Sequence, residues 1–310
     1  MISFKQLRYF DLLATIGHFG KAADRAGVTQ PALSMQIRAL EKSLGGPLVE
    51  RGAAGARLTV LGEQVAARAA KVLAGVRDIE ELAFANGGTL SGTLRLGIIP
   101  SIAPFLLPSL LGLATERFPD LRLSIRETIT GTLVDEITAG ELDAIVASLP
   151  LDHEDLEEAA VVEDRFLLAA PAHSPHAERS PAMADLISAD ELLLLEDGHC
   201  LRDQALAVCH AIDPARLRGF GATSFPTLLQ LVAAGHGLTL LPEIAVNAGV
   251  VNDPRLRVNR FAKPEPSRMI GLAWRRSSPR SRDFAALAGL VGEAATAKTA
   301  TEPLSPGEAA

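Results

Sequence analysis

One long helical pattern divides the chain into two parts and limits the folds that it can adopt. From Thr59 onward, apolar residues recur at alternating spacings of four and three until Asn86-Gly87-Gly88 ends the pattern. The repeat consists of Val65, Ala69, Val72, Val76, Ile79 and Ala83. A repeat of about three heptads is typical of a coiled-coil seam, so residues 59–88 are predicted to form a linker helix that pairs two copies of the chain. The alternative is a helix buried within a single domain.

The segment before this helix is basic, whereas the chain as a whole is acidic. Residues 1–58 carry eight Lys or Arg and four Asp or Glu, a net charge of +4, while the full chain carries −7. A basic module on an acidic body indicates that one end contacts phosphate groups and the other end has a different task. A solvated basic face without a partner would give the same charges, so the interpretation needs a motif.

Residues 19–44 carry the signals of two helices joined by a tight turn. Gly27 can form the turn, Thr29 can cap the second helix, and Pro31 is tolerated in the first turn of that helix. The apolar residues of the second helix recur at helical spacing and are expected to face the core: Leu33, Ile37, Leu40 and Leu44. This pattern predicts a helix-turn-helix, with an ordinary helical hairpin as the alternative.

The opposite face of the second helix is predicted to contact DNA. Gln and Arg side chains can form hydrogen bonds with base edges, and a helix fits the major groove. The sequence LVERGAAGARLT then predicts two short strands around a Gly-rich turn, a wing that places two arginines near the DNA backbone. Residues 1–58 are therefore predicted to be a winged helix-turn-helix domain. The candidate DNA contacts are Thr29, Gln30, Pro31, Ser34, Arg38, Arg51 and Arg57.

The acidic body after Gly92 alternates between strand and helix patterns. Strands are expected at 93–101, 121–129 and 142–149, with helices at 102–117 and 132–139 between them. Such alternation is typical of parallel strands with crossover helices, and therefore of an α/β fold. A second unit is expected between Phe166 and Phe261, with strands in ELLLLEDG and GLTLLPEIAV, and residues 270–276 are expected to return as a strand to the first unit.

Composition excludes several classes of protein. The chain is 48% hydrophobic and 22% charged, which is enough apolar material for more than one ordinary core. No apolar run approaches the roughly 18 residues that a membrane helix needs, and charges interrupt the N-terminal segment where a signal peptide would be apolar. We therefore expect a cytoplasmic protein without a membrane partner.

Both cysteines of the chain lie in the stretch EDGHCLRDQALAVCH, at positions 200 and 209. In one continuous helix the two thiols would be about 13.5 Å apart along the axis and about 180° apart around it. A disulfide needs Cα atoms closer than about 7 Å, so closing one would refold this segment. The spacing matches neither C-x-x-C nor the paired ligands of a structural zinc site, and no metal or cofactor is expected. The alternative is a buried thiol that behaves as a small apolar residue.

The run from Ala22 to Leu44, the wing and the long helix resemble the LysR-type transcriptional regulators, and the resemblance extends over nearly the whole chain. It implies a two-lobed, periplasmic-binding-protein-like sensor domain with parallel sheets at residues 89–295 and a second lobe at about 164–267. The composition of residues 296–310 predicts a disordered tail. The family usually has an aromatic residue where Val49 stands. The implied partners are double-stranded promoter DNA, RNA polymerase and further copies of the chain, as a dimer of dimers.

The motifs LLPSLL, LLEDGHCLRDQA, LVAAGHGLTLLPEIAV and KPEPSRMIGLAWR resemble the hydrogen-peroxide-sensing members of that family. This resemblance implies an activator of the oxidative-stress response that peroxide switches on and cellular thiol reductants reset. Cys200 would be the peroxide-reactive thiolate, favoured by a helix N-terminus and nearby donors, and Cys209 would resolve its sulfenic acid to a disulfide. The implied supporting residues of the peroxide site are His199, Asp203, Thr130, Ser101 and Arg268.

Several alternatives stay open at this point. Ser101 stands where the family commonly has Thr, and Asp203 could simply be a neighbour of Arg202 on a solvated helix. The chain could be a metabolite-responsive regulator with an incidental cysteine pair. It could also be a thiol peroxidase with a DNA-binding appendage, although an oxidation that refolds the active segment suits a stoichiometric sensor better than an enzyme.

Overall fold

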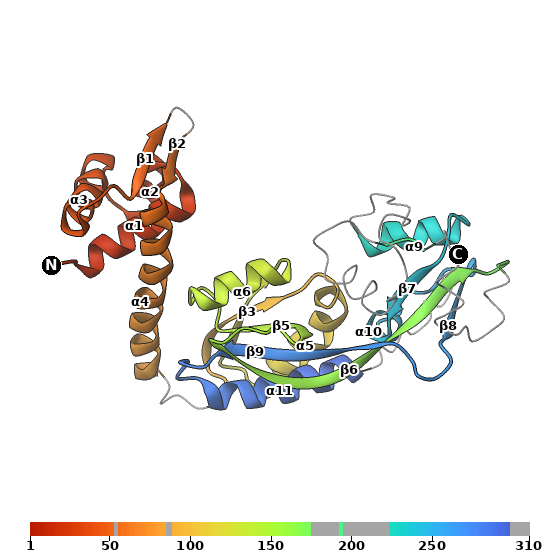
Figure 1. Ribbon diagram of the computed structural model, residues 1–310. Coiled ribbons are helices and arrows are strands. Elements are labelled where there is room, and N and C mark those ends of the chain that lie inside the picture. Colours follow the sequence, from red (N-terminus) through yellow and green to blue (C-terminus); the bar gives the residue numbers. More distant parts are fainter. Residues whose placement is uncertain (53–54, 85–88, 175–191, 195–223, 298–310) are drawn as a thin grey trace, which may run out of the picture.

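The computed structural model describes residues 1–52, 55–84, 89–174, 192–194 and 224–297. These residues form a small head, one long helix and an elongated body built on a mixed sheet (Figure 1). The head stands at one end of the long helix, and the body lies across the other end. The predicted α/β class with an N-terminal helix-turn-helix is confirmed.

The head consists of three helices and a two-stranded wing. Its elements are α1 (Phe4–Ile16), α2 (Phe19–Ala26), α3 (Gln30–Leu44), β1 (Val49–Gly52) and β2 (Gly55–Leu58). The predicted turn is confirmed, because Gly27 adopts a left-handed φ of 67° after α2 and the Thr29 side chain accepts a hydrogen bond from the Ala32 amide at the start of α3. The fully buried Phe10, Leu33 and Leu40 anchor a core separate from that of the body.

The linker helix α4 (Val60–Phe84) leaves the wing directly and packs against α1. Its first turn passes close to the residues that precede the wing, because a Cβ at Gly62 would overlap the backbone oxygen of Leu48. Thr59 fixes the start of the helix: its hydroxyl donates to the Pro47 carbonyl and accepts from the Gly62 amide.

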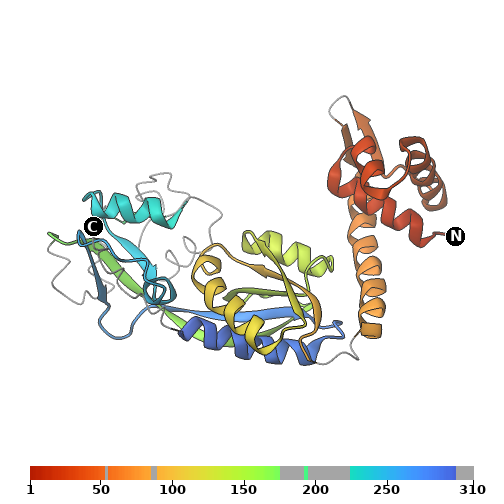
Figure 2. The ribbon, with the colours of Figure 1, turned by 180° about the vertical axis from the view of Figure 1, so that it is seen from behind.

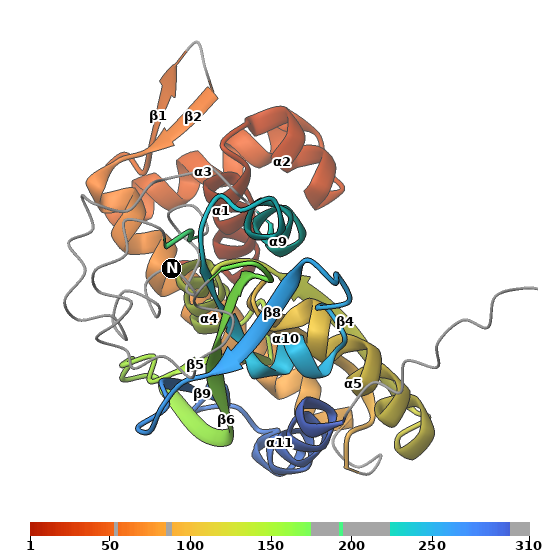
Figure 3. The same cartoon turned by 90° about the vertical axis from the view of Figure 1, so that its right-hand side faces the viewer.

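The first lobe of the body follows the predicted alternation. Its strands are β3 (Gly92–Ile98), β4 (Leu121–Glu127) and β5 (Ala144–Leu149), and β3 pairs in parallel with both others. The crossover helices are α5 (Ala103–Arg117) and α6 (Thr130–Thr138). α6 covers one face of the sheet, while α5 and α11 (Ser281–Thr296) lie together on the other face (Figure 1). Figure 3 shows α5 and α11 from the end of the body.

One strand is shared by the two lobes. β6 (Leu156–Pro171) pairs along its first part with β9 (Ser267–Arg275) and along its second part with β7 (Thr239–Pro242) and β8 (Leu256–Arg260). Figure 2 shows β6 running the length of the body. β9 returns to the first lobe as expected, but it pairs antiparallel with β5, so the sheet is mixed rather than parallel.

The second lobe contains β7, β8, α9 (Phe225–Ala233) and α10 (Glu243–Asn247). The stretch GLTLLPEIAV was expected to be one strand, but Pro242 ends β7 and caps α10, because proline lacks the amide that would continue the strand ladder. Of the expected strand ELLLLEDG, only residues 192–194 are described, and Leu192 forms a parallel bridge with Leu238. Positions 298–310 of the expected tail lie outside the described residues.

Candidate functional site

The exposed face of α3 is a candidate DNA-binding surface. Gln30, Pro31 and Arg38 are exposed there, as the sequence predicted. Met35 is also exposed, with 61% of its surface accessible, although the sequence analysis did not single it out. The spacing of Pro31, Met35, Arg38 and Lys42, which follows the helix on the side opposite the core, could have identified this face.

Ser34 lies at the buried edge of this face rather than in its exposed centre, because only 4% of the residue is accessible. At 3.6 residues per turn, position 34 is only about 80° around the helix from the centre of the apolar stripe. Ser34 therefore packs against the rest of the head, while Met35 lies about 180° from that centre. Its role in DNA binding remains a prediction.

The wing and the helix start add polar groups near α3. Arg57 on β2 is exposed, and Thr29 caps α3, whereas the side chain of Arg51 lies outside the described part of the wing. Val49 packs at the edge of the head core and lines a hollow of about 430 Å³ with Phe19, Ile37 and Arg38. The DNA-binding roles of these residues remain predictions.

The predicted dimer seam of α4 does not form one uniform face of the folded chain. Val65 packs against the head core and Ala69 is 2% accessible, so the chain itself covers the first part of the seam. Val72 and Ile79 are 51% and 67% accessible, which leaves the second part available to another copy. Val76 is partly buried, and the side chain of Ala83 lies outside the described residues. Pairing of two chains through this helix remains a prediction.

The expected peroxide site lies at the carboxyl edge of the first-lobe sheet. Ser101 is in the turn that joins β3 to α5, and Thr130 is the first residue of α6, directly after β4. Arg268 lies near the start of β9, where the two lobes meet. The ends of parallel strands in open sheets are a recurrent position for ligands. His199, Cys200, Asp203 and Cys209 fall within 195–223, outside the described residues.

Arg268 and Ser101 are brought into contact across 167 positions of sequence. Arg268 Nη1 donates to Ser101 Oγ at 2.8 Å, and Nη2 donates to the Ser101 carbonyl oxygen at 3.2 Å. Both residues are 6% accessible. The guanidinium also lies 5.8 Å from the ring centroid of Phe166, a favourable cation–π arrangement. The arginine is therefore fixed in position before any ligand arrives.

Asp164 completes this cluster, and the sequence analysis missed it. It lies directly opposite Arg268 in the β6–β9 ladder, and its Oδ2 accepts from Arg268 Nε at 2.8 Å, with both side chains only 2% accessible. Its Oδ1 accepts from the Ile244 amide at 2.9 Å, at the start of α10. Burial raises the pKa of the Asp164 carboxyl, and this effect outweighs the stabilisation of the carboxylate by Arg268 and the Ile244 amide.

The contact with Arg268 limits where the hydroxyl hydrogen of Ser101 can point. Because the serine oxygen accepts a bond from Arg268, its own hydrogen remains to be donated to another group. A hydroxyl held in this way suits an oxygen that gains negative charge during bond cleavage.

Among the described ranges, no group of three or more His, Cys, Asp or Glu side chains could hold a metal ion. The helices of those same ranges lack the length and apolar composition that a membrane span requires.

Comparison with family models matches two segments of the chain. Residues 4–63 match the bacterial regulatory helix-turn-helix of the LysR family, and residues 87–296 match the LysR substrate-binding domain. Among curated proteins, a probable hydrogen peroxide-inducible genes activator of Streptomyces viridosporus is 40% identical over 296 residues, covering 94% of both chains. The dual regulator OxyR of Escherichia coli K12 is 40% identical over 288 residues, covering 91% of this chain and 92% of the relative. The regulator EstR of Acinetobacter baylyi is 39% identical over 282 residues, covering 91% and 93%.

Solved structures give the same pattern. A full-length OxyR of Pseudomonas aeruginosa with a cysteine-to-aspartate substitution superposes with a TM-score of 0.78 at 35% identity, covering 94% of this chain and 95% of that one. A hydrogen-peroxide-bound OxyR of Corynebacterium glutamicum with a cysteine-to-serine substitution gives a TM-score of 0.65 at 33% identity, covering 95% and 92%.

Proposed function

Because this chain belongs to the LysR family of bacterial transcriptional regulators, we propose that it is a peroxide-responsive DNA-binding regulator switched by a reversible disulfide between Cys200 and Cys209. The observation that carries the proposal is the buried contact of Arg268 with Ser101, which supplies oriented hydrogen-bond donors at the edge of the first lobe. The similarity to peroxide-inducible activators over nearly the whole chain supports it.

The chemistry follows from the residue types. The Cys200 thiolate attacks one peroxide oxygen, the O–O bond breaks, and the departing hydroxide takes a proton to leave as water. The thiol of Cys209 then attacks the sulfur of the sulfenic acid, the S–S bond forms and a second water leaves. Ser101 and Arg268, with Thr130, His199 and Asp203, would stabilise the negative charge on the departing oxygen. Cellular thiols restore the reduced pair by exchange.

The proposed readout is DNA binding by a dimer of dimers. The exposed face of α3 would enter the major groove, while the wing arginines contact phosphates. The regulator would then act with RNA polymerase on promoters of the oxidative-stress response in the cytoplasm. An oxidation that refolds the active segment is poorly suited to rapid turnover, so we propose a stoichiometric sensor rather than an enzyme.

Thiol counting by mass spectrometry before and after one equivalent of peroxide, with DNA footprinting on the same samples, tests the proposal. The wild type should lose two thiols, yield a Cys200–Cys209 peptide and change its footprint. Cys200→Ser should do none of these, whereas Cys209→Ser should still form a sulfenic acid at Cys200. Steady-state peroxide consumption with a thiol donor would instead indicate a peroxidase.

EstR, a relative of similar identity, is not named for a response to peroxide, so we keep a metabolite-responsive regulator as the second candidate. Retention of both thiols after peroxide treatment, together with tighter DNA binding in the presence of a small molecule, would establish that alternative.

A DNA-binding test follows from the exposed face of α3. Arg38→Ala should weaken binding to all duplexes, because a phosphate contact carries no sequence information. Gln30→Ala and Met35→Ala should relax sequence preference while retaining most of the affinity for non-specific DNA. Ser34→Ala should relax sequence preference less than Gln30→Ala does, since only 4% of the residue is accessible.

A further inference from the structure

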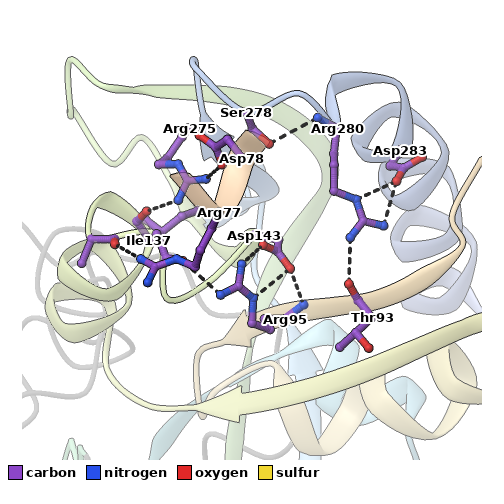
Figure 4. Close-up of polar contacts among 12 residues, drawn as sticks. Arg77, Asp78, Thr93, Arg95, Ile137, Asp143, Arg275, Ser278, Arg280 and Asp283 are labelled. Carbon is purple, nitrogen blue, oxygen red and sulfur yellow. Dashed lines mark hydrogen bonds and ion pairs between the residues drawn. The ribbon is translucent and has the colours of Figure 1, made fainter. Parts of the chain in front are cut away.

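The linker helix α4 is docked on the first lobe through a buried ion pair (Figure 4). Arg275 Nη2, at the end of β9, donates to Asp78 Oδ1 of α4 at 2.5 Å. The two side chains are only 8% and 14% accessible. A second ion pair at this contact, between Lys71 and Asp155, is largely exposed, with side chains 61% and 45% accessible. Because exposed ion pairs contribute little to stability, the buried pair is expected to contribute more to docking than the exposed one.

Three arginines converge on the carboxyl end of α6. Arg77 Nη2 of α4 donates to the Ala139 carbonyl at 2.6 Å, Arg275 Nη1 lies 3.4 Å from the Ile137 carbonyl, and Arg95 Nη1 lies 3.1 Å from the Gly140 carbonyl. The last carbonyls of a helix have no partner within it and carry the negative end of its dipole. α4 and β9 therefore meet at the end of α6 that attracts cations.

The fit between α4 and this corner is close. Gly140 has a φ of 74°, and a Cβ at this position would overlap the Ala74 side chain of α4 and the Arg275 guanidinium. Any other residue at position 140 would push α4 away from the lobe. Glycine is therefore required there both by the backbone conformation and by the approach of α4.

The same corner is crowded with positive charge. Burial and the neighbouring Arg95 and Arg275 lower the pKa of Arg77, against the opposing effect of Asp11 on α1 and Glu141. The Nε atoms of Arg77 and Arg275 are buried without a hydrogen-bond partner among the described residues. Unmade hydrogen bonds and repulsion between cations offset the gain from docking, which suits a contact that can be released.

The two elements that hold α4 also extend to the expected peroxide site. α6 begins with Thr130 and ends at the carbonyls that accept from Arg77 and Arg275. β9 carries Arg268 near its start and Arg275 at its end. The nine residues of α6 span about 13 Å, and the seven positions from Arg268 to Arg275 on β9 span about 23 Å. Hydrogen bonds within the helix and between the strands make both elements stiff. A displacement at one end of either element therefore reaches the other.

We propose that Asp78, Arg77, Arg275 and Gly140 form a latch between α4 and the first lobe, and that α6 and β9 transmit the oxidation state of Cys200 from the expected peroxide site to this latch. Release or tightening of the latch changes the angle at which α4 holds the head, and hence the spacing of paired heads on DNA. This inference rests on the proposed function, since it takes oxidation at Cys200 as the input.

The experiment measures oxidation and footprint separately in the full-length chain. The DNA is a duplex selected by the wild-type protein from a random-sequence pool. Asp78→Ala removes the buried acceptor, and Gly140→Ala inserts a methyl group between α4 and the lobe while all charges remain. Both variants should form the Cys200–Cys209 peptide within about twofold of the wild-type rate, yet lose at least about two thirds of the peroxide-dependent footprint change.

Matched controls separate the latch from general damage. Lys71→Ala removes a charge from the same face of α4 at the exposed pair and should behave as the wild type. Gly92→Ala places the same methyl group at a glycine with a φ of 70° and open surroundings, so it reports the backbone strain alone.

Each outcome has one interpretation. A wild-type footprint change in both Asp78→Ala and Gly140→Ala would overturn the latch while leaving the proposed function intact. Loss of disulfide formation in these variants would overturn it as well, since it would place Asp78 and Gly140 in support of the chemistry rather than downstream of it. A wild type that does not oxidise, or oxidises without a footprint change, would refute the proposed function itself.

Discussion

The two ends of β9 each carry a buried arginine, but the two arginines do different work. Arg268 pairs with Asp164 on the adjacent strand, and both partners belong to the body. Arg275 pairs with Asp78 on α4, which belongs to the linker. The first pair is almost fully enclosed, whereas the second lies where two separately packed parts of the chain meet.

The difference indicates which contact can change during function. Separating Asp164 from Arg268 would require unpairing β6 from β9 and would leave two charges in the core, at a cost of several kcal/mol. Separating Asp78 from Arg275 requires only that α4 move outward, and water can then solvate both groups. The Asp164–Arg268 pair can therefore fix the geometry of the expected peroxide site, whereas the Asp78–Arg275 pair can open when that site changes.

The largest expected effect is that of breaking the enclosed pair. Asp164→Ala should lower the free energy of unfolding of the body by about 3–5 kcal/mol, because it leaves the Arg268 guanidinium buried without a counter-ion. Urea unfolding followed by circular dichroism measures this. Asp164→Asn should cost less, since its amide oxygen can still accept from the Ile244 amide. Equal and small losses in both variants would show that the pair does not organise the body.

Breaking the separable pair should act on the linker rather than on the body. Asp78→Ala should weaken docking by about 1–3 kcal/mol, the usual cost of an unsatisfied buried polar group, and leave the unfolding midpoint of the body unchanged. Hydrogen exchange of the α4 amides near Lys71 to Asp78 measures this, with an expected rise of about tenfold or more. A fall in the midpoint comparable to that of Asp164→Ala would erase the distinction between the two pairs.

Ser101 separates the roles of the two ion pairs, because it accepts hydrogen bonds from Arg268 of the enclosed pair and lies away from the Asp78–Arg275 pair. Ser101→Ala should cost about 1–2 kcal/mol of stability, since Arg268 Nη1 loses its acceptor. It should also slow the oxidation of Cys200 by about tenfold or more, measured by quenched-flow thiol alkylation. Ser101→Thr restores the hydroxyl and should recover the rate. Hydrogen exchange in α4 should be the same in all three proteins.

The smallest expected effect concerns pH and the surroundings of Arg77. Burial raises the pKa of Asp11 on α1 despite the opposing effect of Arg77, so folding disfavours its charged form. The wild type therefore loses stability as the pH rises from the ordinary carboxyl pKa of about 3.9 through the raised value. Asp11→Asn has no such loss. Urea unfolding should find the variant more stable at pH 7, by about 0.5 kcal/mol at most, with the difference shrinking towards pH 4. A difference that grows towards pH 4 would contradict this sign.

The head and the first lobe could be predicted because their signals are local. Gly27 and Thr29 mark the turn and the cap within three positions. The alternation of strand and helix patterns after Gly92 predicts that β3, β4 and β5 run parallel to one another. The burial of Ser34 could not be predicted, because a spacing of four from Gln30 keeps a residue near one helix face without saying how wide the buried stripe is.

The rest depends on pairings between distant residues. Nothing near Asp164 distinguishes it from the exposed acids of the same stretch, and its burial follows from the register with Arg268, 104 positions away. The antiparallel direction of β9 and the docking of α4 are set in the same way. The candidate site was therefore identified through Ser101 and Arg268 by resemblance, while its carboxylate and the latch required the three-dimensional arrangement.

The continuity of β6 determines how the body can deform. Two lobes joined only by loops can rotate about a hinge. In this protein, however, the single strand β6 runs through both lobes, and its residues from Leu156 to Arg165 are paired with β9. The register shift between Ala160 and Val162 adds a bend without interrupting the ladder. Bending of such a connection strains the hydrogen-bonded ladder of β6 and β9, so the two lobes are expected to move relative to each other by only a small amount. A change in the first lobe should therefore reach the second lobe as bending of a continuous ladder rather than as rotation about a hinge.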